Sequence, residues 1–181
     1  MDDETGLLLK AISFSAEKHR SQRRKGPGDI PYINHPLQVA QSLWEIGGVR
    51  DAATLLAAVL HDTLEDTQTT PDELRHLFGE EVLSIVEEVT DDKALPKETR
   101  KQLQIEHAPQ ISAKAKLVKL ADKICNLADI IANPPENWPF ERRQAYVTWT
   151  EQVVAGLRGQ NSGLEQTYDR LLAEGKRVYT L

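Results

Sequence analysis

Apolar residues recur at helical spacing along most of the chain, and no stretch shows the strict alternation of a half-buried strand. The clearest apolar stripe consists of Leu117, Leu120, Ala121, Ile124, Leu127, Ala128 and Ile131. These positions follow the i, i+3, i+4, i+7 pattern of a helix with one face turned toward a core. The run Asn133-Pro134-Pro135 predicts where that helix ends.

The same periodicity, together with capping residues, predicts the other helices. We expect them at about residues 4–21, 35–48, 51–64, 70–79, 80–90, 139–157 and 162–174. Thr70 and Glu73 have the spacing of a capping box, with Pro71 at the first helical position. Residues 23–34, with two glycines and two prolines, and residues 91–96 are expected to be loops. The pattern therefore predicts an all-α, single-domain helical bundle.

Length and charge narrow the class of protein. A chain of 181 residues is long enough for one domain with a substantial core. Its formal net charge of −6 argues against a broad surface for nucleic acid or an anionic membrane, so we expect neither partner. The single cysteine, Cys125, fits a reducing compartment, and no apolar stretch approaches the ~20 residues that span a bilayer. We expect a cytoplasmic protein, and the sequence leaves its oligomeric state open.

The most informative chemistry is the pair His61-Asp62, which follows a run of small apolar residues. An imidazole nitrogen and a carboxylate oxygen can bind the same borderline divalent ion. His35 and Asp122, on other predicted helices, offer two further ligands of the same types. The alternative is that His35 caps a helix and that Asp122 is a solvated helix position. Burying His61-Asp62 without partners would be costly, which favours a metal site.

Two more carboxylates, Glu65 and Asp66, follow His61 and Asp62 by four residues. In a continuous helix this spacing places them on the same face, one turn further along. They are therefore acid–base candidates beside the metal. The alternative is an exposed acidic turn after a helix, which is a common arrangement.

Four motifs, in order along the chain, carry a resemblance to a known family. They are Arg24-Lys25-Gly26, Pro31-Tyr32-Ile33-Asn34-His35-Pro36, His61-Asp62-Thr63-Leu64-Glu65-Asp66-Thr67, and Leu120-Ala121-Asp122-Lys123 with Asn126-Leu127. This set resembles the HD-domain phosphohydrolases and, within them, the stand-alone small alarmone hydrolases of the RelA/SpoT type. The resemblance covers about residues 7–160. It implies one HD hydrolase domain over residues 1–181, with a C-terminal helix at about 162–174.

The resemblance also implies an activity and its ligands. In such enzymes the four matched side chains hold one Mn²⁺; here they are His35, His61, Asp62 and Asp122. The implied reaction is hydrolysis of guanosine 3′,5′-bis(diphosphate), or the pentaphosphate, to GDP or GTP plus pyrophosphate, by attack of a Mn²⁺-activated water on the 3′-pyrophosphate. By the same resemblance, Glu65 and Asp66 position or activate that water.

Substrate contacts are likewise carried over by position. Arg24, Lys25 and Asn126 match nucleotide-binding positions of the family. Lys97, Arg142 and Tyr146 fall where the stand-alone subgroup is expected to contact phosphate or sugar. Two positions depart from bifunctional relatives, which have an aromatic or His where this chain has Cys125 and an Arg where it has Ala128. A small apolar helix position explains Cys125 better than a thiol nucleophile does.

Two alternatives remain open at the level of sequence. The same site could release the 2′-phosphate of NADPH or act on another phosphorylated nucleotide, because both reactions need cations near a metal. A domain that binds an alarmone without cleaving it is a second alternative. The presence of every candidate ligand and both acidic residues argues against that sensor.

Overall fold

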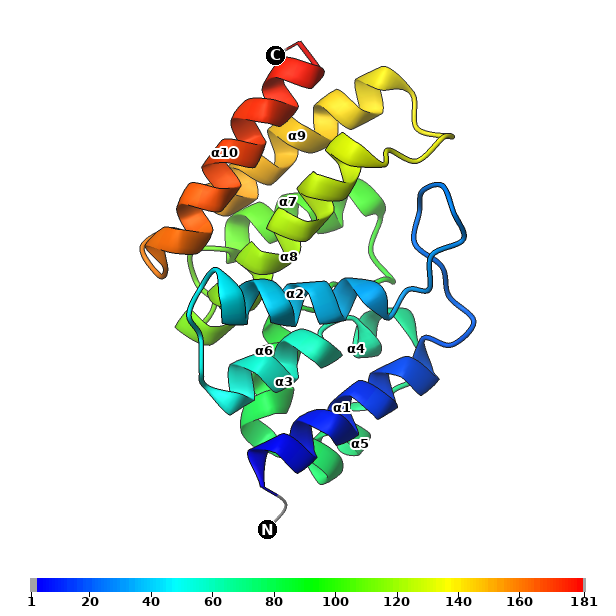
Figure 1. The fold of residues 1–181 in the computed structure, drawn as a ribbon, viewed down its shortest axis with the longest axis vertical. Helices are drawn as coiled ribbons and strands as arrows, with labels where there is room; N and C mark the ends of the chain where they lie inside the picture. The colour runs from blue at the N-terminus through cyan, green and yellow to red at the C-terminus, as the bar shows by residue number, and fades with distance from the viewer. Residues whose placement is uncertain (1–2, 181) are drawn as a thin grey trace.

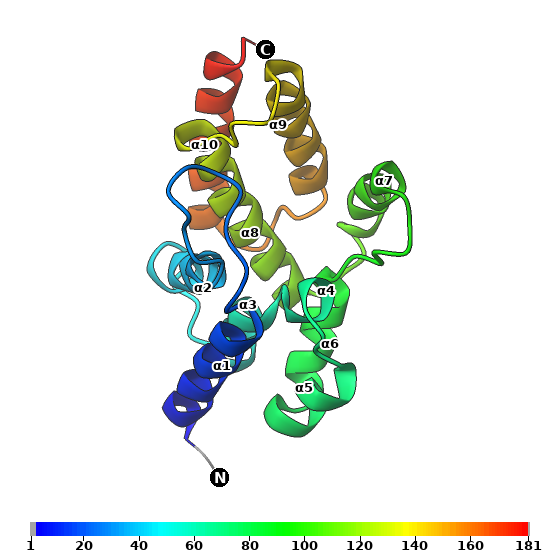
Figure 2. The ribbon, with the colours of Figure 1, turned by 90° about the vertical axis from the view of Figure 1, so that its right-hand side faces the viewer.

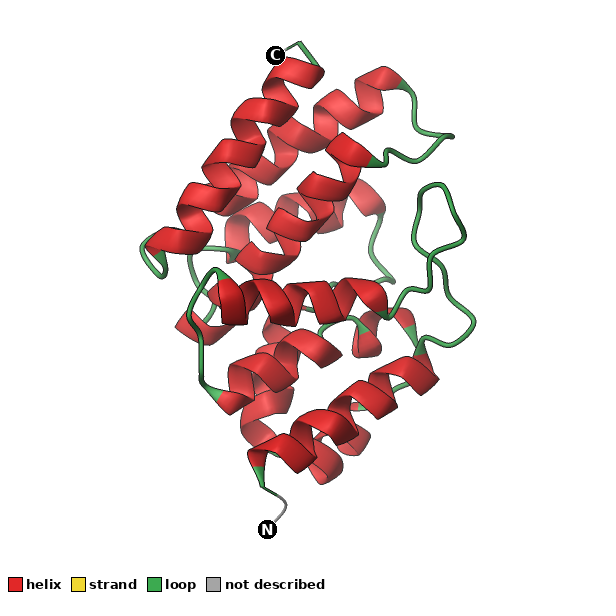
Figure 3. Cartoon of the chain, viewed as in Figure 1, coloured by secondary structure: helices red, strands yellow, loops and turns green. Residues whose placement is uncertain are grey.

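The computed structural model describes residues 3–180, and these form helices joined by loops (Figure 3). The helices are α1 (Glu4–Lys18), α2 (Asn34–Glu45), α3 (Ala52–Leu60), α4 (Thr63–Asp66), α5 (Pro71–Phe78), α6 (Glu80–Val89), α7 (Lys97–His107), α8 (Ala113–Ala132), α9 (Phe140–Ala155) and α10 (Ser162–Val178). The described residues contain no strand, only an isolated bridge between Arg23 and Pro31. None of these helices is both long enough and apolar enough to cross a membrane. The all-α prediction is confirmed.

Side chains at the helix starts explain several of the boundaries. Thr70 and Glu73 form the predicted capping box at the start of α5, each bonding the main chain of the other. Asp51 caps α3 by accepting a hydrogen bond from Thr54 N at 2.8 Å. Gly79, at φ 89°, separates α5 from α6 with a backbone conformation that costs a glycine little.

Helix α8 lies between the two groups of helices that build the molecule (Figures 1 and 2). It packs against α2, α3 and α6 on one side and against α9 and α10 on the other. Four positions of its predicted stripe are buried: Leu120, Ala121, Ile124 and Leu127. Burying a leucine or isoleucine side chain stabilises the fold by about 1.5–3 kcal/mol. The helix that carries Asp122 is therefore also the centre of the core.

Two segments of the structure differ from what the sequence pattern predicts. The helix expected over residues 51–64 ends at Leu60, and α4 begins separately at Thr63, so His61-Asp62 lies at a break. Helix α7 was not predicted at all. Its sequence has only two large apolar residues, and none of its residues is buried, so it lacks an apolar stripe. A tertiary contact helps to hold it, since Trp149 Nε1 donates a hydrogen bond to Lys101 O at 3.1 Å.

Candidate metal centre and substrate cleft

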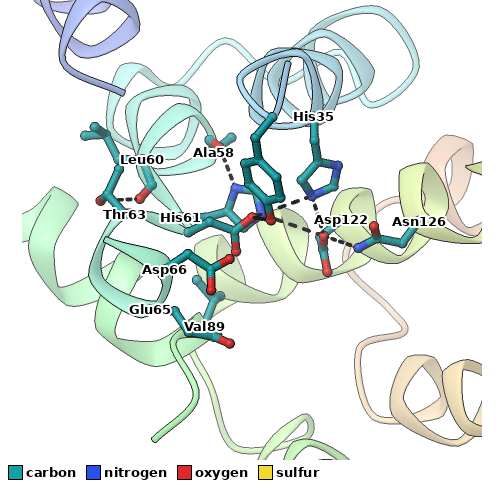
Figure 4. A network of polar contacts seen from close by, with 12 residues as sticks. His35, Ala58, Leu60, His61, Thr63, Glu65, Asp66, Val89, Asp122 and Asn126 are labelled. Carbon is teal, nitrogen blue, oxygen red and sulfur yellow. Dashed lines mark hydrogen bonds and ion pairs between the residues drawn. The ribbon is translucent and has the colours of Figure 1, made fainter. Parts of the chain in front are cut away.

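The four side chains predicted as metal ligands meet in one cavity of about 160 Å³ (Figure 4). His35 Nε2 lies 3.0 Å from Asp122 Oδ1 and 3.8 Å from Asp62 Oδ2. His61 Nε2 lies 3.1 Å from Asp62 Oδ2 and 3.7 Å from Asp122 Oδ1. Ligand atoms of His35, His61 and Asp62 all lie within 4.8 Å of one another. A single ion could reach this group, and an oxygen of Asp122 faces the same point.

Different elements supply these side chains. His35 lies in the first turn of α2, Asp122 in the middle of α8, and His61-Asp62 between α3 and α4. Helix α3 is buried from Thr54 to Leu60, and this apolar run fixes the direction in which the chain delivers His61 into the interior. Both histidines are almost completely buried, with exposed fractions of 1% for His35 and 5% for His61. Ring centroids of the two imidazoles are 5.2 Å apart.

The hydrogen bonds of His61 fit a metal ligand. Its Nδ1 lies 2.8 Å from the carbonyl oxygen of Ala58, so Nδ1 carries a proton, and the neutral imidazole that binds a metal has its lone pair on Nε2. Nε2 is buried and has no hydrogen-bond partner among the described residues. A buried nitrogen with an unused lone pair is costly, and a borderline divalent cation would satisfy it. The donor set therefore fits a divalent metal ion.

Both aspartates are held in the ionised form that a ligand needs. Burial alone would raise the pKa of Asp62, but the positive charge of the adjacent His61, which is protonated when no metal is bound, more than offsets it and leaves the pKa below its ordinary value. Burial acts in the same way on Asp122, and Lys123, 3.0 Å from its Oδ2, holds the pKa well below the usual range. Tyr32 Oη donates to Asp62 Oδ2 at 2.7 Å, and Asn126 Nδ2 donates to Asp122 Oδ1 at 2.6 Å. These donors orient the two carboxylates.

Glu65 and Asp66 both line the metal cavity. Burial, followed by the negative charge of Asp91, raises the pKa of Glu65 to about 7, although Asp91 N also donates to Glu65 Oε2 at 3.2 Å. Asp66 pairs with Lys93, which lines the adjoining cleft. Asp66 N donates to Asp62 O at 2.9 Å, so Asp66 lies one helical turn after Asp62, as the spacing predicts. Glu65 is thus a carboxyl group that can change its charge near neutral pH.

A larger cleft of about 600 Å³ adjoins the metal cavity and shares Tyr32, Asp66, Lys123 and Asn126 with it. Arg24, Lys25 and Tyr146, predicted as substrate contacts, line this cleft. Further lining residues are the aromatic side chains Trp138 and Trp149. Cations, Asn126 and aromatic rings therefore line one space of nucleotide size.

Polar contacts hold the cationic side of the cleft in place. Arg24 donates to Asn126 Oδ1 at 2.8 Å and to Asp129 Oδ2 at 2.6 Å. The aromatic residues of the cleft contact one another, since the Tyr146 ring centroid lies 5.8 Å from that of Trp138 and 5.4 Å from that of Trp149.

Two predicted contacts lie outside the residues that line the cleft. Lys97 is exposed at the start of α7. Arg142 is exposed near the start of α9, with its guanidinium 4.1 Å from the ring centroid of Trp138. Cys125 is buried beside Ser42, and burial raises the pKa of its thiol to about 11, which does not favour a nucleophile.

Sequence reasoning assigned no role to several residues that line these cavities. They are Lys93, Lys119, Lys123, Trp138 and Trp149. One signal was available for two of them. Lys119 and Lys123 stand four residues apart within the apolar helix α8, where uncompensated charges are rare.

Comparison with known proteins places this geometry in a family. The sequence profile of the family described as "HD domain" matches residues 11–163. The chain belongs to the HD-domain family. The matched residues include His61-Asp62, the His-Asp pair at the break between α3 and α4. Family membership carries the expectation of a divalent metal, which agrees with the donors that surround His61.

Relatives of this HD domain include proteins named guanosine-3′,5′-bis(diphosphate) 3′-pyrophosphohydrolase MESH1. The one from Xenopus tropicalis is 55% identical over 174 residues, which cover 96% of this chain and 97% of the relative. The one from Homo sapiens is 52% identical with the same coverage. A solved structure described as "A metazoan ortholog of SpoT hydrolyzes ppGpp and plays a role in starvation responses" superposes with a TM-score of 0.91 at 44% identity. It covers 93% of this chain and 94% of its own.

Proposed function

We propose that this HD domain is a metal-dependent guanosine 3′,5′-bis(diphosphate) 3′-pyrophosphohydrolase that yields GDP, or GTP from the pentaphosphate, and inorganic pyrophosphate. The observation that carries the proposal is the direct junction between a cavity with metal-type donors and a nucleotide-sized cleft lined by cations and aromatic rings. The activity in the names of relatives at 52–55% identity supports it. The proposal includes Mn²⁺ as the ion, a cytoplasmic location, and one hydrolase domain over residues 1–181.

The donors His35, His61, Asp62 and Asp122 would hold the metal. Two imidazoles and two carboxylates suit Mn²⁺ better than Mg²⁺, which prefers an oxygen-only shell. When bound, such an ion lowers the pKa of its water and stabilises negative charge on phosphoryl oxygens. Tyr32 and Asn126 keep the carboxylates oriented toward the ion through the hydrogen bonds described above.

The carboxylates that line the metal cavity would act as acid and base. Glu65 would accept the proton of the attacking water, because a pKa near 7 makes it ionised often enough and basic enough at neutral pH. The water oxygen would attack the phosphorus bonded to the ribose 3′-oxygen, the bond from that phosphorus to the 3′-oxygen would break, and the proton taken up by Glu65 would be returned to the departing 3′-oxygen to give the 3′-hydroxyl. Asp66 would orient the water, and its pairing with Lys93 limits its own mobility.

The substrate's other groups would lie in the adjoining cleft. Arg24 and Lys25 would neutralise phosphate charge, and Asn126 would bind the ribose side. Tyr146 would pack against the nucleoside. Lys97 and Arg142, exposed and outside the cleft lining, would reach only substrate groups that project from its mouth.

The test is Mn²⁺-dependent release of pyrophosphate from guanosine tetraphosphate, run beside an EDTA-treated sample and a reaction with NADPH. Pyrophosphate and GDP in the presence of Mn²⁺, and neither after EDTA treatment, are the expected results. If phosphate is released from NADPH and guanosine tetraphosphate does not react, the assigned site stands and NADPH is the substrate. Tight binding of guanosine tetraphosphate without turnover would favour the sensor.

A further inference from the structure

A third cavity lies behind the metal centre, on the side away from the nucleotide cleft. It has a volume of about 300 Å³ and shares Asp91, Gln104 and Lys119 with the metal cavity. The three cavities are arranged in order along α8. Asn126 and Lys123 line the cleft and the metal cavity, Asp122 lines the metal cavity, and Lys119 lines the metal cavity and the cavity behind it.

Lys119 is a buried cation with unused hydrogen-bonding capacity. Its residue is 7% exposed, and the only hydrogen bond of its ammonium group among the described residues is a long one, 3.3 Å to Val89 O. An ammonium group has three donors, so two are without partners. Lys123, also buried, stands one turn away on the same face of α8. Two neighbouring buried cations are unfavourable unless an anion lies between or beside them.

Burial, reinforced by the charge of Lys123, lowers the pKa of Lys119 to about 8. Lys123 is compensated by Asp122, 3.0 Å away, whereas no carboxylate among the described residues lies within ion-pair distance of Lys119. The nearby Asp91 is engaged by Gln104 Nε2 at 2.6 Å, which satisfies part of its charge. Lys119 thus has no ion-pair partner among the described residues, although Asp91, Asp122 and Glu65 are near enough to offset part of the fall in its pKa.

The geometry of a 3′-diphosphate matches this arrangement. With the nucleoside in the cleft and the phosphorus under attack at the metal, the distal phosphate is attached to that phosphorus through an equatorial oxygen and lies one phosphate further from the ribose. The seven helical steps from Asn126 to Lys119 span about 10 Å at 1.5 Å per residue. That length covers the distance from a ribose to the far phosphate of a diphosphate. We propose that Lys119 binds the distal phosphate of the substrate's 3′-diphosphate and of the pyrophosphate product.

This inference deepens the proposed function and rests on it for the orientation of the substrate. It assigns to Lys119 the discrimination between a diphosphate and a single phosphate. A monophosphate at the metal has no second phosphate to place beside Lys119, so the contact would favour substrates with two phosphates on the reacting oxygen.

The test is calorimetric titration of the Mn²⁺-loaded protein with inorganic pyrophosphate and, separately, with orthophosphate. Binding needs no turnover, so the result does not depend on the proposed activity. Lys119→Met keeps the length and apolar stem of the side chain and removes the charge. Lys116→Met is the matched control, since Lys116 lies on the same helix and lines none of the three cavities. Metal content and the melting temperature are measured for each variant.

We expect Lys119→Met to weaken pyrophosphate binding about 30-fold, which corresponds to about 2 kcal/mol. Orthophosphate binding should change less than about threefold, and Lys116→Met should match the wild type for both anions. Equal loss for both anions, or no loss for either, would overturn the proposal. If Lys119→Met does not fold, the wild type still decides. Pyrophosphate that binds no more tightly than orthophosphate would exclude a distal subsite. If the protein binds pyrophosphate no more tightly than orthophosphate but still hydrolyses guanosine tetraphosphate, the proposed function holds and only the distal subsite is wrong.

Discussion

Removing the hydroxyl of Tyr32 tests whether Asp62 is a metal ligand. Tyr32 Oη donates to Asp62 Oδ2 at 2.7 Å. Tyr32→Phe removes this bond and keeps the ring, whose centroid lies 4.9 Å from that of His19. The fold around the ring should therefore persist while Asp62 loses a donor that orients it.

The expected magnitude follows from the kind of bond that is lost. A hydrogen bond to a charged group contributes about 1.5–3 kcal/mol. Removing a partner that orients a metal ligand typically weakens metal affinity by about 10- to 100-fold. We expect the Kd for Mn²⁺ to rise by that factor in Tyr32→Phe, and turnover to recover most of the wild-type value once Mn²⁺ is saturating.

The assay is competition for Mn²⁺ between the protein and a fluorescent chelator. Tyr168→Phe is the matched control, because it removes a buried hydroxyl that lies 2.9 Å from Thr150 Oγ1 and lines neither the metal cavity nor the cleft. The control should lose thermal stability and keep its Mn²⁺ affinity. If both variants bind Mn²⁺ as tightly as the wild type, the hydrogen bond from Tyr32 does not orient a metal ligand. If both lose affinity equally, the effect is one of global stability.

Three further predictions concern the same centre. Asp62→Ala should abolish Mn²⁺ binding and with it the rise in melting temperature that Mn²⁺ causes, because an ion bound only by the native state stabilises it; a preserved rise in differential scanning fluorimetry would show that Asp62 is no ligand. Glu65→Gln should keep its Mn²⁺ yet lower turnover by about 10²–10⁴-fold, as expected for a lost general base; unchanged turnover would remove Glu65 from the mechanism. The pKa of Glu65, raised from 4.5 to about 7, means that the folded state binds more protons than the unfolded state between these values. The free energy of unfolding of the metal-free protein should therefore fall as pH rises through this window, and fall less in Glu65→Gln; equal slopes in urea titrations from pH 5 to pH 8 would contradict the raised pKa.

The periodicity of apolar residues was sufficient to predict most of the fold, and physical reasons explain the exceptions. The stripe of α8 and the capping box of α5 are local patterns, and both helices are present where they were predicted. Helix α7 has no buried residue, so nothing in its own sequence distinguishes it from a polar loop. The break at His61-Asp62 is also invisible to periodicity, since both segments around it are helical.

The candidate site was predictable to the extent that residue chemistry is local. His61-Asp62 attracts attention because of the apolar run before it, and the structure brings His35 and Asp122 to the same cavity. The aromatic side of the cleft was not predictable in this way. Tyr146 and Trp149 are neighbours because they stand three residues apart on α9, but whether this face of α9 meets the cleft depends on how α9 packs beside α8. Sequence spacing contains no information about that packing.

The central place of α8 has a consequence for how this protein can diverge. Its side chains line all three cavities, and the same helix packs against five others. A substitution on its inward face would therefore perturb chemistry and fold together. Trp138 and Tyr146, on the other side of the cleft, are half-buried and belong to a loop and to α9. New substrate preferences are thus most accessible to evolution at these aromatic residues. The metal site is constrained because the helix that carries Asp122 also forms the centre of the core.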